Sequence, residues 1–129
     1  MPKFNLSAST NFNLIKASDA GVSNDFSLDL NQFLVKHPAA TYFIRIQGDA
    51  MQNIGIHEND IAIVDRSLPP SKNQIIIAEL NGELIIRRME EKNGRTFLLP
   101  ENDTLKPHAI SPDDNFSVWG SVTGIIRKY

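Results

Sequence analysis

The sequence contains no cysteine among its 129 residues. Disulfide bridges, thiolate-bound metals and thiol nucleophiles are therefore excluded. No apolar run approaches the roughly 18 residues that a membrane-spanning helix needs. The segment 1–21 also lacks the continuous apolar stretch of a secretory signal peptide. These absences lead us to expect a cytoplasmic protein that does not contact a membrane.

The net charge is small and histidines are few. The chain carries 13 Lys and Arg against 15 Asp and Glu, a net charge of −2, so its charge balance does not favour sequence-specific DNA binding. Six basic side chains are predicted to lie on solvated strand faces: Arg87, Arg88, Lys92, Arg95, Arg127 and Lys128. The histidines His37, His57 and His108 are dispersed without the spacing of metal ligands, and we expect neither a metal nor another cofactor.

Runs of β-forming residues alternate with turn residues from residue 41 onward. Strands are predicted over about 42–46, 61–64, 74–80, 83–89, 96–99 and 116–127, with a shorter extended piece at 108–110. Asn81-Gly82 between two such runs is a strong hairpin signal, because both turn positions require positive φ. Gly120 and Gly124 interrupt the last strand and indicate a bulge or a bend. The pattern predicts a mainly β domain, built as a curled sheet or partial barrel.

The beginning of the chain has a different composition. It is rich in Ser, Asn, Asp and Ala, and its apolar residues follow neither a strand period nor a helix period. We interpret residues 1–28 as an N-terminal arm that packs opportunistically or remains mobile, followed by a domain at 29–129. A short helix is predicted at about 29–36, behind a capping Ser27 or Asp29.

Five runs of the sequence carry a resemblance to a known family. They stand in the same order and at similar spacing as in that family: DLNQFLVKHPAATYFIRIQGDAM, GIHENDIAIVDRSLPP, IIIAELNGELIIRRM, LLPEN and FSVWGSVTGIIR. Over about residues 29–129 the chain resembles the UmuD branch of the LexA/UmuD family of self-cleaving serine–lysine peptidases. The resemblance implies a strongly bent sheet or partial barrel of the LexA–UmuD C-terminal, signal-peptidase-like type that forms homodimers. The short arm has no room for the helix-turn-helix of LexA repressors, which favours the UmuD branch.

The resemblance places the active site of the family on two motifs. The nucleophilic serine of the family lies in a Gly-Asp-Ser-Met turn, which here is Gly48-Asp49-Ala50-Met51. The general base of the family is a lysine whose pKa is lowered by burial, and Arg87 stands at its position. Alanine has no hydroxyl, and arginine does not deprotonate usefully in a protein. We therefore expect this chain not to cleave itself.

The family cuts its own arm at an Ala-Gly or Cys-Gly bond, and Ala20-Gly21 is the one Ala-Gly pair of this chain. Without cleavage, the resemblance implies an accessory protein of SOS mutagenesis that binds a Y-family, UmuC-like translesion DNA polymerase, with the RecA filament as a further partner. Two alternatives stay open. One is an active autoprotease, stimulated by RecA to cut at Ala20-Gly21, of which this chain is an inactivated variant. The other is a pseudo-protease that heterodimerises with an active paralogue and regulates it.

Overall fold

The structure is a computed structural model that describes residues 29–129. The chain divides into two compact units, residues 1–36 and residues 37–129. The predicted arm, with its Ala20-Gly21 bond, lies outside the described residues.

The described part of the first unit holds one short helix, α1 (Leu30–Leu34). The Asp29 side chain accepts hydrogen bonds from the backbone N–H groups two and three residues ahead, at 3.1 and 3.3 Å, and is the helix cap. The helix is shorter than the predicted 29–36. Its backbone becomes extended at Val35, with φ −117° and ψ 99°, a conformation that suits a β-branched side chain.

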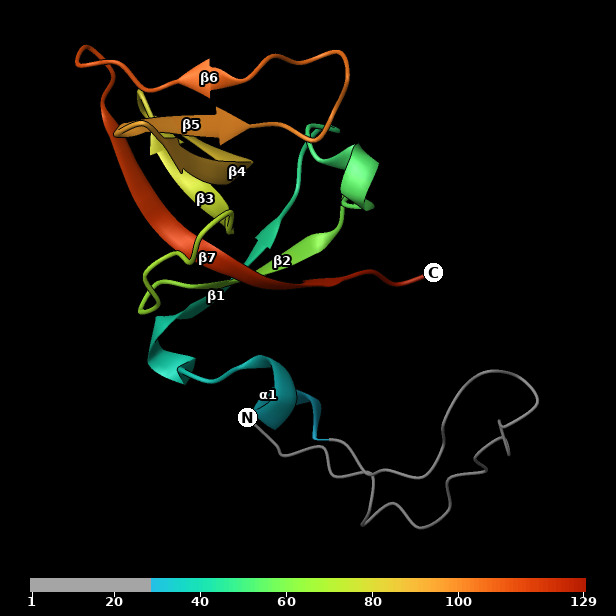
Figure 1. The fold of residues 1–129 in the computed structure, drawn as a ribbon. Helices are drawn as coiled ribbons and strands as arrows, with labels where there is room; N and C mark the ends of the chain where they lie inside the picture. The colour runs from blue at the N-terminus through green and yellow to red at the C-terminus, as the bar shows by residue number, and fades with distance from the viewer. Residues whose placement is uncertain (1–28) are drawn as a thin grey trace, which may run out of the picture. The chain divides into compact units, whose positions relative to one another are not determined.

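The second unit contains one antiparallel sheet of seven strands, in the order β1-β2-β7-β3-β4-β5-β6 (Figure 1). Its strands are β1 (Thr41–Arg45), β2 (Ile61–Asp65), β3 (Ile75–Leu80), β4 (Glu83–Lys92), β5 (Arg95–Leu99), β6 (His108–Ala109) and β7 (Phe116–Ile126). Two short 3₁₀ helices, Pro38–Ala40 and Gln52–Ile54, precede and follow β1. Each predicted strand is present within three residues of its predicted bounds, and the mainly β prediction is confirmed.

The β3–β4 hairpin turns where the sequence predicts. Asn81 and Gly82 both have positive φ, 51° and 87°, as the tight hairpin turn requires. In the resulting register Ile77 of β3 lies opposite Ile86 of β4. Both of these isoleucines line the cavity described below, so the hairpin register sets one of its walls.

The strand β7 bends the sheet, because it pairs with two different strands along its length. Its first half pairs with β3 and its second half with β2, and Ser121 is paired on both sides. Register shifts leave Trp119 and Thr123 as extra residues beside Gly120 and Gly124, which confirms the predicted irregularity. Figure 1 shows β7 as a long curved strand. Because of this bend, β1 and β4 line one cavity although three strands separate them in the sheet order.

Two groups of buried apolar side chains form the core of the second unit. Successive residues of a strand point to opposite faces, and accordingly Ile77 of β3 enters the larger group while Ile76 enters the smaller one. The larger group also holds Met51, which is 1% exposed and lies outside the strands. The chain segment after β1 is therefore anchored directly in the core.

Candidate functional site

The turn at residues 48–51 follows β1 and is supported by the core. Gly48 has a φ of +78°, a left-handed conformation that favours glycine. Its N–H donates to Oε1 of Glu58 at 3.0 Å. Three residues later Met51 is buried in the larger core group. Because both ends of the turn are held, Ala50 between them has a defined position.

A second loop holds this turn from the side of β5. The N–H of Glu101 donates to the carbonyl of Ala50 at 2.8 Å. The side chain of Asn102 donates from Nδ2 to the carbonyl of Asp49 at 2.9 Å. Asn102 is itself buried, and its Oδ1 accepts from the N–H and the hydroxyl of Thr104. The two loops therefore form one hydrogen-bonded unit around Ala50.

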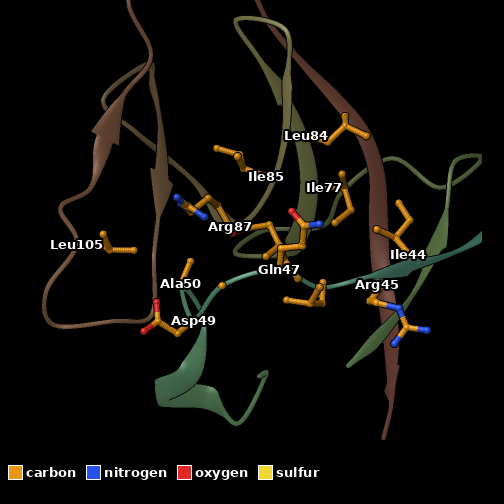
Figure 2. A pocket seen from close by; sticks show the side chains of 13 residues that line it. Ile44, Arg45, Gln47, Asp49, Ala50, Ile77, Leu84, Ile85, Arg87 and Leu105 are labelled. Atoms are coloured by element: carbon orange, nitrogen blue, oxygen red, sulfur yellow. Dashed lines mark hydrogen bonds between the residues drawn. The ribbon is translucent and has the colours of Figure 1, made fainter. Parts of the chain in front are cut away.

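A cavity of about 460 Å³ opens between the turn and the β3–β4 hairpin. One wall runs along residues 44–50, from the end of β1 through the turn, and the other includes Ile77 of β3 and residues 84–87 of β4. Figure 2 shows Ala50 and Arg87 on these two walls, facing the same space. Most other side chains around the cavity are isoleucine or leucine.

Arg87 places a positive charge in this wall. Its side chain is half-buried, and its Nη1 donates to the carbonyl of Ile86 at 2.7 Å. Burial lowers the pKa of the Arg87 guanidinium from its usual value, but an arginine remains protonated in a protein. Among residues 29–129, no carboxylate forms an ion pair with Arg87.

The structure brings together most of the site residues that the sequence singled out. Four of them line the cavity: Gly48, Asp49, Ala50 and Arg87. Met51 does not line it, because its side chain packs into the core. The sequence reasoning missed the part that Glu101 and Asn102 play in holding the turn. Their only signal was the LLPEN run, which marks the family resemblance without indicating which groups it contacts.

The prediction that six basic side chains lie on solvated strand faces is wrong for Arg87 and Arg88, which are half-buried, while Arg127 is exposed and lies just after β7. Arg87 is half-buried in the cavity wall, and Arg88 donates from Nε to Oε1 of Glu101 at 2.9 Å. Arg127 forms a two-pronged ion pair with Asp60, whose side chain is only 3% exposed. Glu101 lies two residues beyond Leu99, which is opposite Arg88 in the β4–β5 register, whereas Asp60 lies 67 residues from Arg127 and nothing near Arg127 in the sequence indicates it.

The described histidines pair with carboxylates or lie in turns. His37 contacts Asp65 at 2.6 Å, and His108 contacts Asp114 at 2.9 Å. Within residues 29–129, no three His, Cys, Asp or Glu side chains gather closely enough to hold a metal ion. In the same part of the chain, no helix has the length and apolar character needed to cross a membrane.

The chain is similar to a known family and to several known proteins. The Peptidase S24-like family model matches residues 11–123. SamA of Salmonella typhimurium is 37% identical over 114 residues, which are 86% of this chain and 76% of SamA. MucA of Escherichia coli is 37% identical over 97 residues, 74% of this chain and 66% of MucA. LexA repressor 2 of Pseudomonas syringae is 36% identical over 87 residues, 67% of this chain and 43% of that repressor.

Proposed function

Because this chain belongs to the peptidase S24-like family, the family of LexA and UmuD, we propose that it is an accessory protein of SOS mutagenesis that has kept the peptidase fold and lost the cleavage reaction. The observation that carries this proposal is that Ala50 and Arg87 line one cavity. The family resemblance assigns these two positions to the nucleophile and the general base. A site with this composition supports peptide binding rather than peptide hydrolysis.

Self-cleavage needs an oxygen nucleophile and a group that accepts its proton. Ala50 supplies no oxygen, and Arg87 keeps its proton. No serine, threonine, cysteine, lysine or histidine lines the cavity within the described residues to take over either task. The Asp49 carboxylate is present in the wall, but a base without a hydroxyl to activate performs no acyl transfer.

The protein then acts through its partners. We propose that it is a cytoplasmic homodimer that binds a Y-family, UmuC-like translesion polymerase, with the RecA filament as a further partner. The UmuD-type sequence runs and the similarity to SamA and MucA support this role. Two aromatic side chains of β1, Tyr42 and Phe43, are 46% and 53% exposed and offer apolar surface to a protein partner.

Self-cleavage of the full chain tests the loss of chemistry. We expect the unaltered chain to stay intact at alkaline pH, as judged by its intact mass. The double variant Ala50→Ser/Arg87→Lys should release a fragment ending at Ala20, whereas either single variant should stay whole. A cut after Ala20 in the unaltered chain would overturn the proposal. A double variant that also stays whole would contradict the assignment of the lost reaction to these two positions alone.

Co-purification tests the partner. Tagged full chain is expressed with a Y-family polymerase, once without and once with a relative that retains the Ser–Lys dyad, and the material bound to the tag is identified by mass spectrometry. We expect the polymerase to be recovered in cells that lack the active relative. Recovery of the active relative without the polymerase would contradict the accessory role and favour the regulatory alternative.

A further inference from the structure

Arg87 is a cation without a charged partner in the described part of the chain. A guanidinium has five N–H donors, and the described structure shows one of them bonded, from Nη1 to the carbonyl of Ile86. The others are not buried, so they are free to donate to water or to a ligand. The planar fork of a guanidinium matches a carboxylate, to which it can donate two parallel hydrogen bonds.

Arg88, the next residue of β4, does have a charged partner in the described structure. Its Nε donates to Oε1 of Glu101. Neighbouring residues of a strand point to opposite faces, so Arg87 leaves β4 on the other face. Asp49 also lines the cavity, but in Figure 2 its carboxylate lies on the opposite side of Ala50 from the Arg87 guanidinium. These two side chains form no ion pair, so an anion that pairs with Arg87 would come from a ligand or from outside residues 29–129.

Two features show how a peptide ligand would reach Arg87. β1 is a terminal strand of the described sheet and pairs with β2 alone, so its other edge can accept an added extended strand. The cavity wall follows this segment from Ile44 to Ala50. Ala50 lies at the end of this segment. Its methyl group lacks the oxygen atom of a serine side chain, and the space that this oxygen would fill is left for an oxygen of the ligand.

We propose that this cavity binds the free C-terminal end of an extended peptide, with the terminal α-carboxylate beside Ala50 and paired with Arg87. The inference rests on the proposed function, because it takes the cavity to be a peptide cleft that no longer cuts. Its ligand has the chemistry of a cleaved chain, which ends in a carboxylate. An uncut peptide presents a neutral amide at the same place and offers no charge to the guanidinium.

A main-chain carboxylate fits this site better than an acidic side chain does. A strand added to β1 directs its side chains alternately to the two faces, whereas its terminal carboxylate continues along the strand toward Ala50. Apolar side chains of the walls, including Ile77 and Ile85, lower the local dielectric constant and so strengthen an ion pair formed beside them. A small final residue suits a space enclosed by such branched side chains.

Fluorescence anisotropy with the full chain tests the inference. The probe is the peptide Asn-Leu-Ile-Lys-Ala-Ser-Asp-Ala, which copies residues 13–20, labelled at its N-terminus and ending in a free carboxylate. The same peptide with a C-terminal amide is the matched control. We expect the acid to bind about ten-fold more tightly than the amide, because only the acid forms a charge-assisted pair. A third peptide with Asp19→Asn should keep this preference.

Variants of the chain identify the group that recognises the carboxylate. Arg87→Gln should bind acid and amide peptides equally, and Arg87→Lys should keep a reduced preference because it retains the charge without the fork. Arg95→Gln removes the same charge from an exposed side chain that stacks on Phe97, and it should behave like the unaltered chain. Circular dichroism establishes that each variant is folded. If Arg87→Gln does not fold, the acid and amide peptides are compared on Arg87→Lys instead.

The outcomes separate this inference from the proposed function. Equal binding of acid and amide by the unaltered chain would overturn the carboxylate site, as would failure to bind either peptide. Loss of the preference in the Asp19→Asn peptide would show recognition of a side chain and would also overturn it. None of these results bears on whether the chain cleaves itself, which is measured independently by intact mass.

Discussion

Arg127 and Asp60 join the end of the last strand to the loop before β2 through two parallel hydrogen bonds. Nε donates to Oδ1 and Nη2 donates to Oδ2, both at 2.7 Å. Arg127 also donates to the carbonyl of Gly55. The carbonyl of Asp60 in turn accepts the N–H of Ile46, just before the Gly48 turn. One ion pair between residues 67 positions apart therefore supports the segment that carries the candidate site.

Replacing Arg127 by methionine should lower the midpoint of thermal unfolding by several degrees. The Asp60 carboxylate is 3% exposed and would be left without its charged partner. Lys128→Met, which removes a neighbouring exposed charge, is the matched control and should leave the midpoint nearly unchanged. Asp60→Asn should cost less in the Arg127→Met background than in the unaltered chain. Equal costs in the two backgrounds would contradict a coupled pair.

Acid should destabilise the second unit through two buried carboxylates. Hydrogen bonds from Arg127 lower the pKa of Asp60 from 3.8 to about 2, and those from Ser67 lower the pKa of Asp65 from 3.8 to about 2. A carboxyl whose pKa is lower in the folded state stabilises the fold above its unfolded pKa, and this contribution is lost as the pH falls through the folded pKa. The urea midpoint should therefore be flat above about pH 5 and fall between about pH 4 and pH 2.

Two variants link this acid transition to named groups. Asp60→Asn and Asp65→Asn should each make the fall of the urea midpoint below about pH 4 shallower, because each removes one carboxyl whose pKa is lowered in the folded state. Asp113→Asn, an exposed position, controls for the loss of one negative charge. An acid slope that is the same in all three variants would show that other groups drive the transition.

Asn102→Ala should destabilise the protein by about 1–3 kcal/mol, because it leaves the Asp49 carbonyl and the groups of Thr104 without their buried partner. Asn53→Ala is the matched control. Asn53 is exposed and its side chain bonds only to Asp103, so its loss should cost less than about 0.5 kcal/mol. Hydrogen exchange should quicken at residues 48–52 in Asn102→Ala. Unchanged exchange there would mean that the side chain does not hold the turn.

Gly120→Ala should destabilise the protein by about 1–3 kcal/mol through overpacking. A Cβ added at this bulge would lie 2.5 Å from Cγ1 of Val64 and 3.3 Å from Cγ of Arg66. Val64→Ala removes the nearer atom, so Gly120→Ala should cost less in that background when urea midpoints are compared. The same cost in both backgrounds would locate the strain elsewhere on β7.

Much of the fold was accessible from the sequence because its signals are local. The β-forming runs place the strands, Asn81-Gly82 sets a hairpin through its φ preference, and two glycines of β7 mark its bulges. The helix was predicted too long, since its length depended on where Val35 becomes extended. The candidate site was located by motif resemblance, which names the positions 50 and 87 without showing that they meet.

The residues 48–51 illustrate this limit. Their sequence predicts a turn that carries alanine where the family has serine, and that chemical identity holds in any fold. That the turn is clamped by Asn102 depends on a loop 53 residues away. No hydrophobic periodicity or turn motif near residue 50 indicates that this loop contacts the turn.

The sequence by itself determined the set of strands, the tight hairpin and the residue types at positions 50 and 87, because these depend on local backbone preferences and on chemical identity. Only the tertiary structure decided which arginine meets which carboxylate. Strand alternation places Arg87 and Arg88 on opposite faces. The β4–β5 register puts Leu99 opposite Arg88 and so brings Glu101, two residues later, within its reach. The bend of the sheet at β7 lets the turn of residues 48–50 and Arg87 line the same cavity.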